Sequence, residues 1–297
     1  MRLALRFALS ASVFLIILLL IVKIKLEDVW DQYGVSNYIA HSWKNTFQHG
    51  PVQNIPTFDG EASHKVVIMA KMEKENTDWV AENLPDWQAA IYTVNPSPNT
   101  TDTTLTTPMN KGRESMAYLS YVIDNYANLP STLVFLHSHR SGFFSAWHTD
   151  TPLHDNVDAL RSLQIPFVQK NGYVNLRCNW NPGCLEAHRH NAHVTPEVWK
   201  DVFAGTSKEE KAPSNTNGQA PTLVGAACCA QFAVSKDQVL ARPLSDYERF
   251  REWIIDTEKS DAKSGRVLEF LWHVIFGKDA VYCPAEEKCY CDVYGHC

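Results

Sequence analysis

The chain has 297 residues, of which 45% are hydrophobic and 20% are charged, and its formal net charge is -6 at pH 7. This length and apolar content predict one large folded domain or two small ones. The acidic balance provides no positive field to hold a phosphate backbone, so nucleic acid is excluded as an expected partner.

The beginning of the chain predicts a membrane segment. An apolar stretch runs from Phe7 to Val22, and it approaches the ~17–25 residues that cross a bilayer. Lys23 and Lys25 follow directly, in place of the small residues of a signal-peptide cleavage site. We therefore expect an uncleaved transmembrane signal anchor, with its cytoplasmic tip, in residues 1–25, and the membrane as a partner. A cleaved signal peptide is the alternative.

The rest of the chain divides into three predicted parts. Residues 26–63 hold scattered aromatic residues with proline and glycine, and they predict a stem. Residues 64–282 contain apolar runs with strand and helix periodicity, which predict the folded, catalytic-like body. Residues 283–297 form a cysteine-rich tail that has almost no apolar residues to fold around.

Cysteine usage indicates the compartment. Eight cysteines in a chain of otherwise ordinary composition are typical of an oxidising environment, where disulfides form. The spacings in the tail do not match the paired CxxC motifs of structural zinc sites, so they predict a disulfide staple, with a zinc knuckle as the alternative. The tail cysteines are Cys283, Cys289, Cys291 and Cys297.

Two further pairs of cysteines lie in the body. Cys178 and Cys184 enclose a turn, which predicts a local bridge between them. Cys228 and Cys229 are adjacent and are not expected to pair with each other, so one of them is interpreted as a small buried apolar residue. The glycosylation sequon at Asn99 agrees with a body in the lumen of the secretory pathway, in the ER or Golgi, or outside the cell.

The first half of the body predicts alternating strands and helices. Residues 64–71 and 89–95 are short runs rich in β-branched residues, and residues 75–85 between them have helical spacing. A longer helix is expected at 112–130 and another strand at 132–137. This order predicts an α/β fold with a mainly parallel central sheet flanked by helices.

The second half of the body predicts one more strand and two helices. Residues 222–235 form an apolar run of strand character. Helical periodicity follows at 245–257, and a last helix is expected at 267–277.

Three histidines follow the internal strand 132–137. His137 and His139 lie two residues apart and share one face if the strand continues, and the loop that carries His148 can fold back onto them. The carboxyl end of an internal strand is where open α/β sheets bind ligands. The cluster therefore predicts a zinc or manganese site. A polar loop at the end of a buried strand is the alternative.

Several segments together resemble a known family. "VVIMAKMEKENTDWV", "GYVNLRCNWNPGC", "GAACCAQFAVSKDQV" and "LEFLWHVIFG" resemble a fungal family of membrane-anchored proteins known only as a domain of unknown function, over residues 64–283. More distantly, the layout is similar to glycosyltransferases of the A-type nucleotide-sugar fold. That resemblance implies transfer of a sugar from a nucleotide donor to a hydroxyl acceptor. The sequence His137-Ser138-His139 stands where those enzymes carry an acidic DxD metal motif.

The transferase interpretation assigns roles to individual residues. Lys111 and Arg113, at the start of a predicted helix, and Arg140 are the candidates to bind the diphosphate. Glu269 and His273 lie four residues apart, hence on one face of the predicted helix, and are the candidate general bases. A charged first helical turn and a helix-surface ion pair are the alternatives for these two groups.

Two other functional classes remain open from the sequence. The first is a metal-dependent enzyme of another type, such as a tailoring enzyme of secondary metabolism that acts on a small molecule and uses His137, His139 and His148 as ligands. The second is a non-catalytic lumenal protein, an alternative that the missing DxD motif supports.

Overall fold

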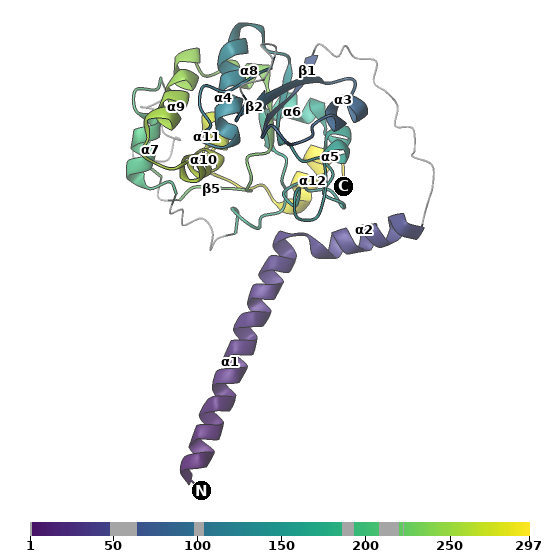
Figure 1. The fold of residues 1–297 in the computed structure, drawn as a ribbon, viewed down its shortest axis with the longest axis vertical. Helices are drawn as coiled ribbons and strands as arrows, with labels where there is room; N and C mark the ends of the chain where they lie inside the picture. The colour runs from purple at the N-terminus through teal and green to yellow at the C-terminus, as the bar shows by residue number, and fades with distance from the viewer. Residues whose placement is uncertain (1, 48–63, 98–103, 186–192, 208–219, 222) are drawn as a thin grey trace. The chain divides into compact units, whose positions relative to one another are not determined.

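A computed structural model describes the chain outside residues 1, 48–63, 98–103, 186–192, 208–219 and 222 (Figure 1). The chain divides into two compact units, Met1–His49 and Gly50–Cys297. The sequon residue Asn99 lies outside the described residues.

The first unit is helical. Helix α1 spans Arg2–Gln32 and α2 spans Val35–Phe47, with Gly34 at φ 56° in the turn between them. Helix therefore occupies much of the predicted stem, because residues 26–47 contain no proline that would interrupt it. In the described part of the chain, no helix combines the length and the apolarity that crossing a membrane requires, and the predicted transmembrane anchor is left without support.

A five-stranded sheet of order β2-β1-β3-β6-β4 forms the centre of the second unit. Its strands are β1 (Lys65–Lys71), β2 (Gln88–Thr93), β3 (Thr132–His137), β4 (Tyr173–Asn175) and β6 (Phe232–Ser235). β1 pairs in parallel with both β2 and β3, whereas β6 lies antiparallel between β3 and β4. The prediction of an α/β fold with a mostly parallel central sheet is confirmed. A separate parallel pair joins β5 (Gly225–Ala226) and β7 (Val281–Tyr282).

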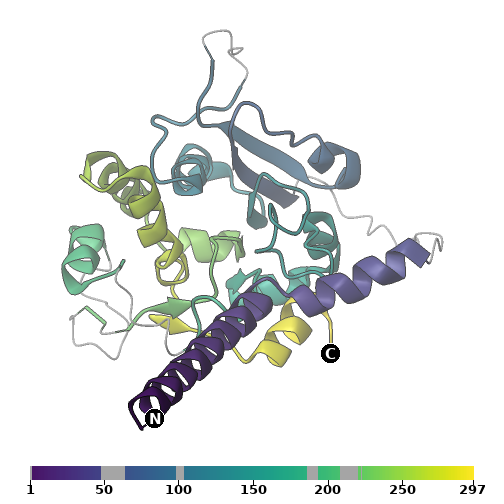
Figure 2. The same cartoon turned by 60° about the horizontal axis from the view of Figure 1, so that its bottom comes forward.

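Helices cover both faces of the sheet (Figures 1 and 2). They are α3 (Trp79–Asn83), α4 (Glu114–Asn125), α5 (Asn156–Ser162), α6 (Ile165–Asn171), α7 (Pro196–Phe203), α8 (Lys236–Leu240), α9 (Leu244–Asp256), α10 (Asp261–Glu269), α11 (Trp272–Ile275) and α12 (Glu286–Tyr294). Alternate side chains of β1 enter different cores, as the pleat requires. Val66 and Ile68 pack with α4, α9 and α10, whereas Val67 and Met69 pack with α3, α5 and α12.

The predicted strand 222–235 is divided in the structure. Its residues form β5 and β6, and Cys229 and Ala230 between them have φ 91° and 52°. These left-handed conformations turn the chain, so the strand cannot continue through them. The apolar pattern was correct about burial and wrong about continuity, because a buried turn carries the same residues as a buried strand.

The predicted helix 267–277 is also divided, into α10 and α11. The N–H of Leu271 donates to the carbonyl of Leu268, three residues back, which tightens the backbone and ends α10. Glu269 and His273 therefore do not lie on one face of a single helix, and this part of the prediction is wrong.

All six predicted disulfide cysteines are bridged, but not all as expected. The tail closes one bridge within itself, Cys291–Cys297, and reaches the body through two others, Cys178–Cys289 and Cys184–Cys283. The expected local bridge between Cys178 and Cys184 is therefore wrong. Cys228 and Cys229 pair with each other, contrary to the prediction. Four disulfides agree with an oxidising compartment.

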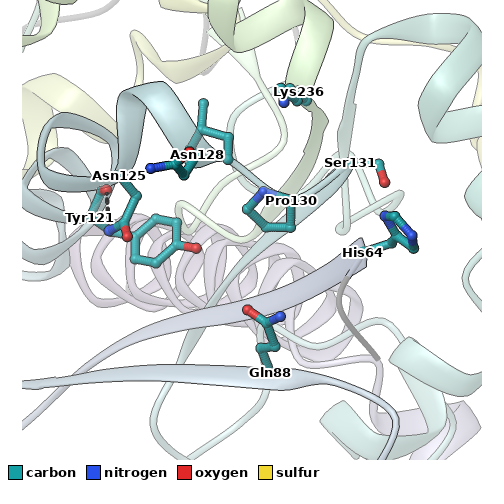
Figure 3. A pocket seen from close by; sticks show the side chains of 9 residues that line it. His64, Gln88, Tyr121, Asn125, Asn128, Pro130, Ser131 and Lys236 are labelled. Atoms are coloured by element: carbon teal, nitrogen blue, oxygen red, sulfur yellow. Dashed lines mark hydrogen bonds between the residues drawn. The ribbon is translucent and has the colours of Figure 1, made fainter. Parts of the chain in front are cut away.

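A polar cavity of about 370 Å³ lies at the amino edge of the sheet, beside the starts of β1, β2 and β3 (Figure 3). Its lining includes the polar side chains of Gln88, Asn125, Asn128, Ser131 and Lys236. The predicted metal-binding and catalytic residues are not among the described residues that line it.

Candidate functional site

The carboxyl edge of the sheet brings some of the predicted site residues together. β1, β2 and β3 all end there, and β6 begins there because it runs antiparallel, with Phe232 opposite Phe135. Helix α4 follows β2 and precedes β3, so its amino end lies toward the same edge. Open α/β sheets bind ligands at this edge.

His137 and His148 lie ring against ring at the end of β3. Their ring centroids are 4.4 Å apart and the ring planes meet at 76°. Burial lowers the pKa of His137 to about 4, and burial also lowers the pKa of His148, with His137 beside it adding to the shift. Both rings are therefore neutral at pH 7. The Nε2 atom of His137 and the Nδ1 atom of His148 are buried without a hydrogen-bond partner, so each can bind a metal or a ligand.

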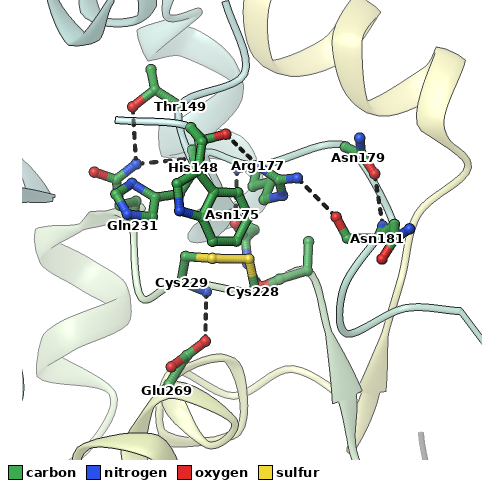
Figure 4. The surroundings of a disulfide bond; sticks show 12 residues. His148, Thr149, Asn175, Arg177, Asn179, Asn181, Cys228, Cys229, Gln231 and Glu269 are labelled. Carbon is green, nitrogen blue, oxygen red and sulfur yellow. Dashed lines mark hydrogen bonds between the residues drawn. A yellow bond between two sulfur atoms is a disulfide. The ribbon is translucent and has the colours of Figure 1, made fainter. Parts of the chain in front are cut away.

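Gln231 fixes the positions of these two histidines. Its Oε1 accepts the backbone N–H of His137 at 3.0 Å, and its Nε2 donates to the backbone carbonyl of His148 at 3.4 Å. The amide just before β6 therefore holds the end of β3 and the following loop together. Figure 4 shows Gln231 beside His148 and Thr149 of that loop. Sequence reasoning missed this role, because a single glutamine carries no motif.

His139 does not join the pair of rings. Its Nε2 lies 3.6 Å from Glu75 Oε1, and its side chain is 46% exposed. Among the described residues, the group of three metal-binding side chains whose ligand atoms all lie within 4.8 Å of one another is Cys228, Cys229 and Glu269. The three histidines predicted as a metal site do not form such a group.

Glu269, the last residue of α10, places a carboxylate whose side chain is 9% exposed at this edge. Its Oε1 accepts the backbone N–H of Cys229 at 2.9 Å (Figure 4), and Arg266 Nη1 donates to both carboxylate oxygens at 2.8 Å. Burial raises the pKa of Glu269, and Arg266 opposes that shift. A carboxylate with a raised pKa is a stronger base than an ordinary glutamate, and it can accept a proton from a hydroxyl group.

The amino end of α4 adds charge beside Glu269. The side chain of Arg113 packs against Gly265 of α10, where a Cβ atom would fall 2.9 Å from Arg113 Cγ. The backbone N–H of Arg113, at φ 51°, donates to Asp261 Oδ1 at 2.8 Å. Burial raises the pKa of Glu114 to about 7, although Arg113 and Arg266 both oppose the shift. Two guanidinium groups and two carboxyl groups therefore meet where α4 and α10 pack together.

The other two cations predicted to bind phosphate have partners elsewhere. Lys111 Nζ donates to the backbone carbonyls of Ile255 and Thr257, at 2.9 and 2.5 Å, and so holds the end of α9. Arg140 Nε donates to Asp155 Oδ2 at 3.3 Å, beside the start of α5. Of the three predicted cations, Arg113 is the one that lies against α10. Arg266 was missed, although its position three residues before Glu269 predicts an ion pair on a helix.

His273 is a buried residue of the core. Its Nε2 lies 3.0 Å from the backbone carbonyl of Ala280, and since a carbonyl only accepts, Nε2 carries the proton. Burial lowers the pKa of His273 to about 4. This ring connects α11 to the segment before β7. Glu269 and His273 belong to different helices, so they do not form a pair of catalytic groups on one helix face.

Acid destabilises the folded state through His273. The unfolded chain takes up a proton near pH 6.5 and the folded chain near pH 4, so stability falls as the pH is lowered across that interval. We expect His273→Gln, which keeps a donor for Ala280, to remove about 3 kcal/mol of this loss between pH 6.5 and 4. Urea unfolding of both proteins at several pH values measures the difference. Parallel pH curves for the two proteins would contradict the assignment.

A protein-family model matches most of the chain. The model of the family described as "Protein of unknown function (DUF3431)" matches residues 67–292, so the chain is a member of it. No curated protein and no solved structure matches the chain.

Proposed function

We propose that this DUF3431 protein is a glycosyltransferase-like enzyme that moves a sugar from a nucleotide donor to a hydroxyl acceptor at the carboxyl edge of its sheet. The observation that carries the proposal is the carboxylate of Glu269. Its side chain is mostly shielded from solvent, its pKa is raised, and its orientation is held by Cys229 and Arg266. These are the properties of a general base that deprotonates an acceptor hydroxyl.

The sheet order supports the proposal. Three parallel strands are followed by the antiparallel strand β6, and the segment "GAACCAQFAVSKDQV", which resembles the acceptor-side segment of A-type glycosyltransferases, contains β6 and the turn before it. Glu269 lies against this segment through its contact with Cys229. The carboxylate is therefore beside the place where the resemblance implies that the acceptor binds.

Cationic groups for the leaving diphosphate come from α4 and α10. Arg113 and Arg266 both act on the ionisation of Glu114, so both guanidinium groups are near the first turn of α4. The backbone N–H groups of a helix amino end also favour anions. We assign the diphosphate to Arg113, Arg266 and the start of α4, in place of the predicted set with Lys111 and Arg140.

A metal-dependent enzyme of another type is the second candidate. It is favoured by the two buried imidazole nitrogens, His137 Nε2 and His148 Nδ1, that have no hydrogen-bond partner. Neutral imidazoles suit zinc or manganese better than magnesium, and a bound metal would supply Lewis acidity at this edge. In that case His137 and His148 would hold the ion, and the acidic DxD motif would not be needed.

The compartment of the proposed reaction follows from the cysteines. Four disulfides agree with a body that folds in an oxidising environment. We propose that the body lies in the lumen of the secretory pathway or outside the cell. Of these two, the lumen is the compartment in which nucleotide-sugar donors and hydroxyl acceptors meet.

Nucleotide binding is the direct test. The oxidised protein is heated with uridine, guanosine and cytidine diphosphate sugars, each with and without Mn²⁺. A ligand at about a hundred times its Kd adds about 2.7 kcal/mol, which raises the Tm by roughly 5–10 °C for a domain of this size. We expect such a shift for one nucleotide, and a smaller one for Arg113→Ala. Stabilisation by Zn²⁺ or Mn²⁺ alone, with none by any nucleotide, would favour the second candidate.

A further inference from the structure

The disulfide between Cys228 and Cys229 lies inside the candidate site. It joins neighbouring residues in the turn between β5 and β6, next to Glu269 (Figure 4). The two side chains are 3% and 8% exposed, so they face the protein more than the solvent. The transfer proposed above uses the backbone N–H of Cys229 and neither sulfur. In the oxidised form the sulfurs are not thiolates, which are the form of cysteine that binds metals.

We propose that reduction of the Cys228–Cys229 disulfide creates a zinc site, in which the two thiolates and the carboxylate of Glu269 bind the ion and His137 completes the coordination. The ligand atoms of the first three residues already lie within 4.8 Å of one another. Zinc accepts sulfur, nitrogen and carboxylate ligands in tetrahedral geometry. The site therefore requires rotation of side chains and no rearrangement of the sheet.

His137 supplies the fourth ligand. Its Nε2 is buried and has no hydrogen-bond partner. The backbone N–H of His137 donates at 3.0 Å to the side chain of Gln231, which lies two residues after Cys229 in the chain, so the end of β3 is held beside the segment that carries the two cysteines. A neutral imidazole is the form that binds a metal.

The charges of the reduced, metal-bound site can be balanced. Two thiolates and one carboxylate carry three negative charges, which Zn²⁺ and the guanidinium of Arg266 would balance. Arg266 already donates to both oxygens of Glu269 at 2.8 Å.

Reduction of this bridge is compatible with the fold. The bridge closes no loop of chain, because its residues are adjacent in sequence, whereas two of the other bridges close 111 and 99 residues. In the chain-entropy account, a disulfide stabilises a protein less as its loop becomes shorter. The two thiols can therefore appear while the body stays folded.

The reaction is a two-electron reduction by a dithiol. One thiolate of the reductant attacks Cys228 or Cys229 Sγ and breaks the S–S bond, and the second thiolate then attacks the mixed disulfide. The protein gains two electrons and two protons, and the reductant leaves as its own disulfide. Zinc binding then releases the two thiol protons.

Zinc binding at this site would regulate the sugar transfer, an inference that rests on the proposed function. Zinc would occupy the carboxylate of Glu269, which would no longer be available to accept a proton from an acceptor. The reduced, zinc-bound protein would then be inactive, and oxidation would release the ion and restore the base.

The test measures zinc directly. The full chain is treated with dithiothreitol at increasing concentration, and the thiols that appear are alkylated and located by peptide mass spectrometry. We expect Cys228 and Cys229 to react before the four cysteines of the two long-loop bridges, Cys178–Cys289 and Cys184–Cys283. Protein reduced to that point, without alkylation, is mixed with Zn²⁺, passed through a desalting column and analysed for metal. One zinc per chain is expected, against none for the oxidised protein.

Variants identify the ligands. Cys228→Ser should abolish retention of zinc, and Glu269→Gln and His137→Ala should weaken the affinity at least tenfold. The matched control is Cys291→Ser with Cys297→Ser, which removes a bridge outside the site and should leave zinc binding unchanged. If Cys228→Ser fails to fold, wild-type protein alkylated at Cys228 and Cys229 after reduction should bind no zinc.

Two results would overturn the proposal. One is a reduced, folded protein with both thiols free that retains no zinc. The other is zinc retention that survives alkylation of the pair. The zinc experiment measures metal content, whereas the nucleotide screen measures the Tm. A failure of the zinc proposal can therefore be distinguished from a failure of the proposed function.

Discussion

Replacing Glu269 by glutamine should lower kcat of the proposed transfer by about 10²–10⁴-fold, the usual contribution of a general base. Glutamine has nearly the same shape and can still accept the N–H of Cys229, but its amide cannot take a proton from a hydroxyl group. The measurement is release of nucleoside diphosphate from the nucleotide sugar that stabilises the protein on heating. Binding of that donor should change little.

The pH dependence gives a second readout of the same residue. Burial raises the pKa of Glu269, so its carboxylate becomes protonated at a higher pH than an ordinary glutamate. The transfer rate should therefore fall as the pH drops through that pKa, since the protonated acid cannot act as a base. Glu269→Gln should lose this dependence along with most of the rate.

The matched control is another buried carboxylate that pairs with an arginine. Asp246 in α9 accepts from Arg242 Nη1 at 2.8 Å and is 1% exposed. Asp246→Asn should lower stability and leave kcat of the folded protein unchanged. A Glu269→Gln protein that turns over at the wild-type rate would remove Glu269 from the chemistry and with it the observation on which the proposed function depends.

The sequence predicted the sheet well because its strands carry simple patterns. Residues 64–71 and 132–137 are short β-branched runs, and both became buried central strands in parallel register. The strand-helix-strand order constrained their direction. The antiparallel strand β6 could not be foreseen, since periodicity reports which side chains are buried and not the direction of a strand.

Local irregularities were missed for a different physical reason. The break at Leu271 and the turn at Cys229 both lie inside mostly apolar segments, where tertiary packing overrides local propensity. Disulfide partners are set by distance in space, so the spacing of Cys178 and Cys184 could not reveal that both reach the tail.

Some residues of the candidate site could be predicted from the sequence and others could not. The position of His137 at the end of an internal strand was readable, and its contact with His148 follows from the short loop between them. Glu269 was chosen from a resemblance and does lie at the same edge, whereas His273 lies in the core. Gln231 acts through a contact between segments that are distant in sequence, and no local pattern marks it. Arg266 lies three residues before Glu269 on α10, a spacing that predicts the ion pair, but nothing in the sequence places that pair beside the disulfide turn.

Removing the two bridges that join the tail to the body should unfold the protein or nearly so. Cys178–Cys289 and Cys184–Cys283 are nested, and only the stretches 178–184 and 283–289 separate them. With one bridge intact, the other closes a loop of about a dozen residues, so its loss should cost about 3 kcal/mol in the chain-entropy account. Losing the second bridge as well opens a loop of about a hundred residues and adds about 5 kcal/mol.

The loss of stability expected for the double variant is therefore larger than the sum of the losses for the two single-bridge variants. Each pair replaced by alanine should lower the free energy of unfolding by about 3 kcal/mol, and both pairs together by about 8 kcal/mol, which approaches the whole stability of a typical domain. Urea unfolding of the wild type, the two single-bridge variants and the double variant measures this. Cys291–Cys297 spans six residues outside the nested pair and serves as the control, with a loss of about 2 kcal/mol that adds independently. Strictly additive losses for the nested pair would show that packing of α12 against α5 and α6, rather than loop closure, holds the tail in place.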